Sequence, residues 1–152
     1  MLPANWLTRD SVRTLSDRQK LVLIAARART SACGVADVGL EEMAWIVGNG
    51  CTSDDVREAF QVSQRLGLIE RDEETNEVFF IDFFKFEKFY GKGWSMLDKS
   101  VQKIESKKIK KSVEQHRPHP QPKPADDLYR MSKMDRIVAG HTRIGVGSAA
   151  DL

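Results

Sequence analysis

Four polar side chains between residues 57 and 65 recur at a spacing that places them on one side of a helix. Arginine can donate paired hydrogen bonds to a guanine edge or bind a phosphate, and glutamine can pair with adenine. Side chains of this kind on an exposed helix are typical of elements that read the major groove of DNA. The candidate DNA-reading residues are Arg57, Gln61, Gln64 and Arg65.

A second basic set follows at four-residue steps, and we expect one helix over Trp94–Gln115 to carry it. Ammonium groups along one side of a helix can follow a phosphate backbone without reading sequence. The alternative is a solvated surface helix whose apolar side packs on the domain or on a second copy of the chain, and both readings can hold together. The candidate phosphate contacts are Lys99, Lys103, Lys107 and Lys110, and the apolar stripe is Trp94, Leu97, Val101 and Ile104.

Acidic residues lie close to the candidate reading set. Asp54, Asp55 and Glu58 share its helix, and the run Asp72–Glu74 follows it. Phosphates repel carboxylates, and the electrostatic attraction to phosphate supplies most non-specific affinity for DNA. The sequence therefore leaves open a module of the same outline that docks protein instead.

The charge is distributed unevenly along the chain. Residues 1–90 hold 11 Lys and Arg against 15 Asp and Glu, a net charge of −4, and residues 91–152 hold 13 against 7, a net charge of +6. This asymmetry indicates that the two parts meet different partners. With 41% apolar and 30% charged residues and no long apolar window, we expect no membrane association.

The start of the chain lacks the layout of a signal peptide, and Cys33 and Cys51 are far apart and without nearby histidines. We therefore expect free thiols and a cytoplasmic location.

Catalytic and metal-binding patterns are weak. No Ser-His-Asp set, glycine-rich phosphate loop or pair of carboxylates stands out, so we do not expect an enzyme or a cofactor. His116 and His119 have a spacing that suits a metal, but the proline-rich segment around them offers no third ligand. We therefore expect no metal site.

The order of predicted elements is helix, loop, helix, turn, helix and hairpin. Ser16 caps a first helix with an apolar face of Leu21, Ile24, Ala25 and Ala28, and residues 30–38 form a loop. The pattern predicts an α+β winged helix-turn-helix, with three helices and a β-hairpin wing.

The later predicted elements are a short helix over Leu40–Val47, with Trp45 in the core, and a third helix capped by Ser53. Strands over Leu68–Arg71 and Glu77–Ile81 enclose a polar turn. We expect one side of this hairpin to pack on the helices, and the aromatic residues between 83 and 90 to close the core.

A tryptophan and a leucine-serine pair open the chain between Trp6 and Leu21. A helix over Ser53–Phe60, a glycine-leucine-isoleucine exit at Leu66–Ile69, an acidic wing at Asp72–Phe79 and an aromatic-basic segment at Phe83–Phe86 follow. Over roughly residues 5–90 this pattern resembles the winged-helix domains of phage replication proteins of the replisome-organiser type. The resemblance implies a domain that binds origin DNA and a C-terminal part that recruits a helicase or its loader.

Four regions follow from these patterns: a winged-helix domain over 1–90, a basic helical extension over 91–115, a proline-rich linker over 116–124 and a flexible tail over 125–152. In the tail, we expect an amphipathic helix that folds in the groove of a partner protein. Its candidate partner-binding residues are Leu128, Met131, Met134 and Ile137.

The sequence thus predicts a phage or mobile-element protein that binds double-stranded DNA in replication initiation and recruits a host or phage replication protein. A transcriptional regulator with the same domain is one alternative. An adaptor that binds a host protein without DNA is another. A homodimer is compatible with each.

Overall fold

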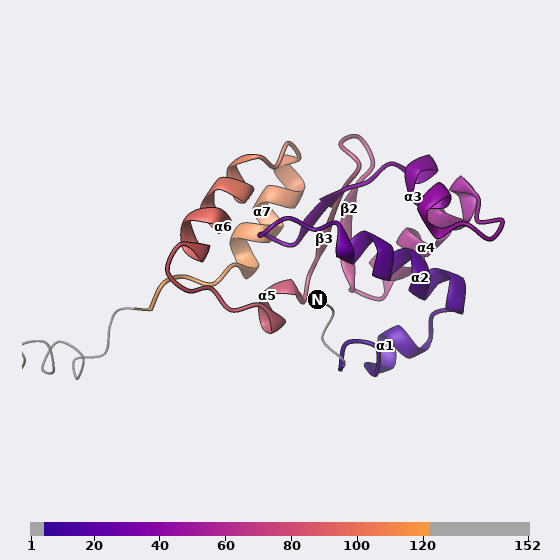
Figure 1. Cartoon of the computed structure of the whole chain (residues 1–152), viewed down its shortest axis with the longest axis horizontal. Helices are drawn as coiled ribbons and strands as arrows, with labels where there is room; N and C mark the ends of the chain where they lie inside the picture. Colours follow the sequence, from indigo (N-terminus) through magenta and orange to yellow (C-terminus); the bar gives the residue numbers. More distant parts are fainter. Residues whose placement is uncertain (1–4, 122–152) are drawn as a thin grey trace, which may run out of the picture. The chain divides into compact units, whose positions relative to one another are not determined.

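The computed structural model describes residues 5–121. Met1–Pro118 form one compact unit, and residues from His119 belong to a second. The described part has an α+β fold with seven helices and a three-stranded antiparallel sheet, which confirms the predicted class and is compatible with a winged-helix-like arrangement (Figure 1). In chain order the elements are α1 (Asp10–Arg13), α2 (Asp17–Ala28), β1 (Val35–Asp37), α3 (Leu40–Val47), α4 (Ser53–Arg65), β2 (Ile69–Asp72), β3 (Glu77–Phe80), α5 (Phe83–Phe86), α6 (Gly93–Gln102) and α7 (Lys107–His116).

The sheet has the order β1-β3-β2, with all neighbours antiparallel. The β2–β3 hairpin forms within one or two residues of its predicted bounds, and Asn76 turns the chain into β3 with a φ of 59°. The prediction of a plain loop over residues 30–38 was wrong, because Val35 pairs with Phe79 and begins a third strand. This strand is three residues long, too short for its alternation to be recognised in the sequence.

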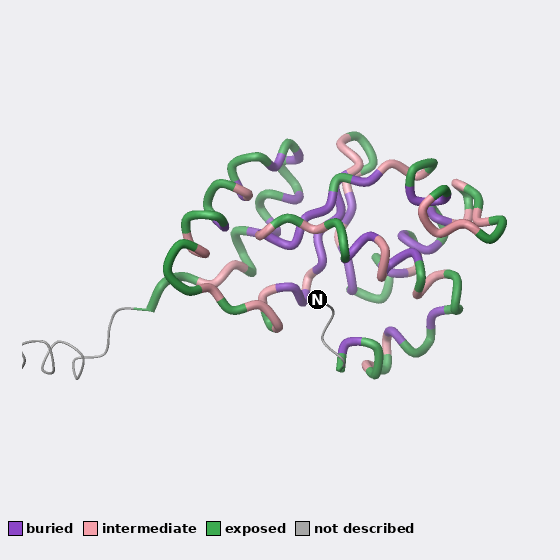
Figure 2. Tube along the Cα trace, viewed as in Figure 1, coloured by how far each residue is buried: buried purple, intermediate pink, exposed green. Residues whose placement is uncertain are grey.

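Helices cover both faces of the sheet. In Figure 1, α2, α3 and α4 lie on one side of the strands, and α6 and α7 lie on the other. All four residues of β3 are therefore buried (Figure 2). Phe79 and Phe80 lie on opposite faces of the sheet, because successive side chains of a strand alternate. The expectation that only one side of the hairpin packs on helices was wrong, because α7 covers the second side.

The first long helix buries a different face from the one predicted. Ser16 and Gln19 form a capping box, as expected for a helix that starts there. Its buried residues are Val22, Leu23, Ala26 and Arg27, whereas Leu21 is half exposed. Apolar side chains occupy every position from 21 to 26, so periodicity alone does not select the packed face.

A tight turn joins α3 to α4. Gly48, Asn49 and Gly50 all have positive φ, which confirms the predicted end of α3. The N-cap of α4 is Thr52 rather than Ser53, and Thr52 and Asp55 form a capping box.

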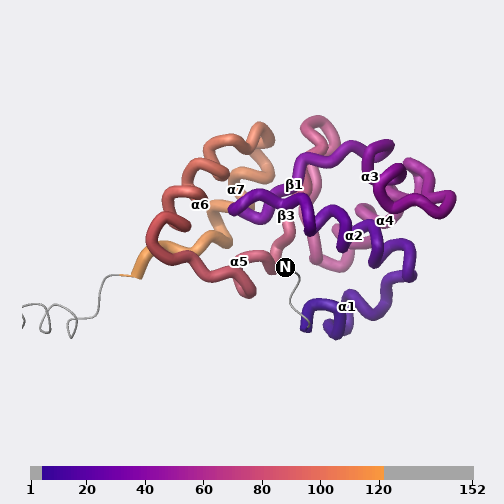
Figure 3. Tube along the Cα trace, in the orientation of Figure 1, coloured from indigo at the N-terminus to yellow at the C-terminus, as the bar shows by residue number. Residues whose placement is uncertain are grey.

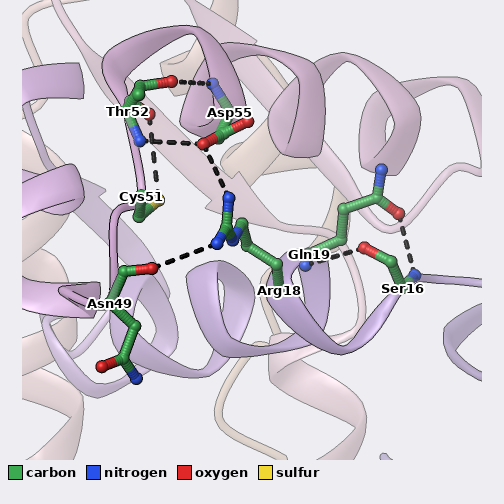
Figure 4. A network of polar contacts seen from close by, with 7 residues as sticks. All are labelled: Ser16, Arg18, Gln19, Asn49, Cys51, Thr52 and Asp55. Atoms are coloured by element: carbon green, nitrogen blue, oxygen red, sulfur yellow. Dashed lines mark hydrogen bonds and ion pairs between the residues drawn. The ribbon is translucent and has the colours of Figure 1, made fainter.

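An arginine connects this turn to α2. Arg18 of α2 donates to Asp55 Oδ2 at 3.0 Å and to the carbonyl of Asn49 at 3.1 Å (Figure 4). The same Asp55 oxygen accepts the amide of Thr52. The start of α4 is thus held against α2 by one side chain.

The predicted helix over Trp94–Gln115 is two helices. The chain leaves the helical path between α6 and α7, and Ser106 caps α7 (Figure 3). Leu97, Val101 and Ile104 are buried as predicted, and Ile109 and Val113 of α7 join the same core. The basic helical extension therefore packs with residues 1–90 in one compact unit that ends at Pro118.

Three aromatic residues lie where the sequence did not place them. Trp6, for which the sequence predicted no core position, is buried ahead of α1. Trp45, expected in the core, is 84% exposed on α3. In the aromatic segment, Phe83 is buried and Phe84 packs against it edge to face, as expected for core closure, but Tyr90 is exposed.

Candidate nucleic-acid interface

The candidate reading residues share the outer face of α4. Helix periodicity places Val56, Ala59, Phe60 and Ser63 in the core, and the side chains between them face outward. Three of the four candidates line a shallow hollow of about 410 Å³. All four candidates are exposed: Arg57, Gln61, Gln64 and Arg65.

Charges on this face largely cancel. Arg57 Nη1 lies 2.7 Å from Asp54 Oδ1, and Glu58 is exposed one residue further along. The hydrogen bond from the Thr52 amide and the Arg18 guanidinium keep the pKa of Asp55 below its usual value, so this carboxylate stays ionised. The face offers hydrogen-bonding groups for base edges but little net positive charge for phosphates.

The tip of the hairpin is acidic. Glu73 and Glu74 are exposed there, whereas Arg71 is buried beneath them. The Arg71 guanidinium lies 5.3 Å from the ring centroid of Phe60 and pairs with Glu73 at 3.2 Å. Burial lowers the pKa of Arg71 without removing its charge. The hairpin tip therefore presents carboxylates to solvent, which repel a phosphate backbone.

The lysines fall on two helices, so the predicted single stripe was wrong. Lys99 lies in α6, Lys103 is its C-cap, and Lys107 and Lys110 lie in α7. α7 also carries Lys108 and Lys111 and has no acidic residue in its first turn. Among the described residues, none of these six lysines forms an ion pair, although Lys108 Nζ donates to the carbonyl of Arg71 at 3.1 Å.

The two candidate surfaces lie on different sides of the sheet. α4 packs on β2 from one side, and α7 contacts β2 and β3 from the other (Figure 1). The exposed lysines of α7 therefore do not extend the outer face of α4.

The start of α7 is fixed by two acidic residues of the hairpin. Ser106 Oγ donates to Asp72 Oδ2 and accepts the amide of Ile109. Glu77 Oε1 accepts the amides of Glu105 and Ser106, each at 2.9 Å. A serine ahead of a run of lysines is a local signal for the helix cap at Ser106. Nothing in the sequence indicated that its partners are Asp72 and Glu77, about thirty residues earlier.

Comparison with known proteins adds no relative. No protein-family model, curated protein or solved structure matches this chain. The assignment of a site therefore depends on the geometry of this chain alone.

Metal and membrane patterns were also sought in the part of the chain that the structure describes. Residues 5–121 contain no group of three or more His, Cys, Asp or Glu that could hold a metal ion. None of the helices described is sufficiently long and apolar to cross a membrane.

His116, the first residue of the predicted linker, belongs to α7, and the predicted tail lies outside the described residues. His116 ends α7, with its ring 5.8 Å from the Phe79 ring and its Nδ1 hydrogen-bonded to the Ser112 carbonyl. The expected partner-binding residues Leu128, Met131, Met134 and Ile137 lie outside the described residues.

Proposed function

We propose that this chain is a winged-helix protein that binds duplex DNA. The order α2, β1, α3, α4, β2, β3, with β3 between the other strands, supports this fold. In this arrangement α3 and α4 are the helix-turn-helix, α4 is the recognition helix, and residues 72–77 form the wing.

The observation that carries DNA binding is the unpaired lysine set of α7. Lys107, Lys110 and Lys111 are exposed, and none is neutralised by a carboxylate within the described residues. Lys107 and Lys108 occupy the first turn of α7, where a positive charge opposes the helix dipole, so helix stability does not explain their position. Binding of phosphates does explain it, since each lysine that contacts a phosphate releases a counterion.

Salt-dependent binding to duplex DNA tests this function. Changing Lys107, Lys110 and Lys111 to Gln should weaken binding to all duplexes. The slope of log K against log salt concentration should become less steep by about 0.9 for each phosphate that is no longer bound. The matched control changes Arg13, Lys88 and Lys92 to Gln, three exposed cations that form no ion pair with a described residue, and so makes the same change in net charge elsewhere. An α7 variant with the affinity and salt dependence of the parent, or equal losses in the two triple variants, would show that α7 does not bind DNA.

Sequence reading is assigned to α4 and tested separately. Arg65 is exposed and lies beside Gln61 and Gln64, and Arg57 can exchange Asp54 for a base. Arg57→Ala or Arg65→Ala should cost roughly 1–3 kcal/mol on a preferred site while sparing non-specific binding. Unchanged footprints of both variants would assign α4 to protein docking.

We further propose that the DNA is a replication origin of a phage or mobile element and that residues 125–152 recruit a replication protein. This proposal is supported by the resemblance of residues 5–90 to phage replisome organisers. Its test is whether plasmid DNA carrying the coding region and its flanks replicates only when the protein is produced. Repression of a flanking promoter without replication would favour a transcriptional regulator.

A second candidate function is an adaptor that binds a host protein without DNA. Trp45, 84% exposed on α3, supports it together with the acidic wing tip. Tryptophan is among the residues that contribute most to protein interfaces. Absence of DNA binding, with a nuclease-resistant complex that is lost in Trp45→Gln but kept in Tyr90→Ser, would favour this function.

A further inference from the structure

A cavity of about 420 Å³ lies between β1, the wing and the end of α6. Its lining includes three carboxylates, from Asp37, Glu77 and Glu105, and two basic side chains, from Arg29 and Lys103. The formal charge of the lining is therefore −1. A volume of this size is within the range of small-molecule sites in proteins.

Two oxygen atoms of residues that line the cavity lack a protein donor. Glu77 is only 5% exposed, and its Oε1 accepts the amides of Glu105 and Ser106. Its second oxygen, Oε2, is buried without a hydrogen-bond partner among the described residues, and the same is true of Thr75 Oγ1. A buried carboxylate oxygen that accepts no hydrogen bond destabilises the folded protein. A ligand that donates a hydrogen bond to this oxygen removes that cost, which adds to its binding free energy.

The basic residues of the cavity do not satisfy these oxygens. Arg29 is engaged by Glu42, whose Oε1 lies 2.5 Å from Arg29 Nη2. Lys103 is exposed at the C-cap of α6 and forms no ion pair with any described residue. A carboxylate oxygen and a hydroxyl oxygen thus remain without a donor beneath the surface of the cavity.

We infer that this cavity binds a small organic cation, whose ammonium or guanidinium group displaces the groups that cover Glu77 Oε2 and Thr75 Oγ1 and donates to both oxygens. These groups supply several N–H donors and a positive charge, which suits a lining of net −1. The site does not use the lysines of α7 or the outer face of α4, so it is independent of the proposed DNA surfaces. It adjoins Ser106, the N-cap of α7, through the two amides that bind Glu77.

The experiment is an NMR titration of the full chain with three probes at constant ionic strength. Putrescine offers an ammonium group, agmatine offers a guanidinium group, and 1,4-butanediol is a neutral match in length. We expect saturable shifts of the Glu105 and Ser106 amides with at least one cation and none with the diol. The probe that binds more tightly identifies the preferred group.

Single substitutions assign the binding to the two oxygens. Glu77→Gln and Thr75→Val should each weaken binding by about tenfold or more, because each removes an acceptor for a charged donor. Thr75→Val removes a hydroxyl that has no protein partner, so its fold should persist even if Glu77→Gln unfolds. Lys103→Met should tighten binding, because it removes a positive charge from the cavity lining.

Glu74→Gln is the matched control, since it makes the same charge change at the exposed wing tip. It should leave the affinity for both cations unchanged. Three results would overturn the proposal: shifts that are equal for the cations and the diol, shifts that survive both Glu77→Gln and Thr75→Val, or shifts that fall as much in Glu74→Gln as in those two variants.

Discussion

The hydroxyl of Ser106 donates a hydrogen bond to Asp72 across 34 positions of sequence, while its oxygen accepts a free amide of the first turn of α7, that of Ile109. One buried side chain thus joins the hairpin to the lysine helix. The position of the proposed phosphate-binding surface relative to the sheet depends on this contact.

Replacing Ser106 by Ala should destabilise the protein by about 1 kcal/mol, the usual loss for a helix N-cap, with a further loss from the Asp72 bond. Urea unfolding measures the change, and amide exchange in α7 locates it. Ser95→Ala, an exposed change in α6, is the control and should cost little. Equal stability of Ser106→Ala and the parent would show that this cap does not hold α7.

Stability should fall on acidification, in part through Asp72. The Ser106 hydroxyl, and then the Glu74 amide, lower the pKa of Asp72 in the folded state. A carboxylate with a lowered folded-state pKa stabilises the fold above its unfolded pKa of about 3.9, and this stabilisation disappears as the pH falls through the folded-state value. Asp72→Asn should therefore lose less stability than the parent on acidification below about pH 4.

This comparison uses urea unfolding over a pH series, with Asp10→Asn as the control for loss of an exposed carboxylate. Some acid sensitivity should remain in Asp72→Asn, because the pKa of Asp55 is also lowered. A pH profile of Asp72→Asn that superimposes on that of the parent would contradict the assignment.

Gly34 should not tolerate a side chain. Its φ is +77°, and an added Cβ would lie 2.7 Å from Phe83 Cβ. Gly34→Ala should therefore cost on the order of 1–3 kcal/mol through backbone strain alone, with more from the overlap. Gly93→Ala, at the start of α6 and only in ordinary contact with Phe89, should leave the melting temperature unchanged or slightly raised. Similar melting temperatures for the two variants would contradict the close approach at Phe83.

Arg27 should be replaceable by Met more easily than by Lys. Its guanidinium is buried, lies 4.3 Å from the Phe83 ring centroid and is 3.8 Å from Glu87. Burial lowers the pKa of Arg27, which reflects the cost of keeping its charge there. A lysine at this position keeps the cost of a buried charge but cannot stack a planar group on the Phe83 ring. Arg27→Lys should therefore lower the free energy of unfolding by about 1–2 kcal/mol. Chemical denaturation of Arg27→Lys and Arg27→Met gives the order, and a more stable Arg27→Lys would contradict it.

The elements with strong local signals could be predicted from the sequence. The capping pair of Ser16 and Gln19 starts α2, and the positive-φ run from Gly48 to Gly50 ends α3. The alternating residues around a polar turn form the β2–β3 hairpin. In each case the hydrogen bonds or dihedral angles that define the element lie within a few residues, so the sequence contains the whole signal.

The outer face of α4 could also be predicted, because the buried positions Val56, Ala59, Phe60 and Ser63 follow one period. The cavity beside Glu77 could not, because it exists only where β1, the wing and the end of α6 meet. In the sequence, Glu77 is not distinguishable from the other acidic residues of the predicted wing.

Only the tertiary structure decided the rest, since the forces that decide it act between distant residues. β1 is a strand because β3 pairs with it about forty residues later, and the same pairing buries β3 between two helical layers. The helix predicted over residues 94–115 is divided into α6 and α7 because the amides of Glu105 and Ser106 bind Glu77 instead of continuing the helical hydrogen bonds. Trp45 faces solvent because Met43 and Ala44 occupy the packed side of α3, and local sequence does not specify which apolar side chains meet a partner.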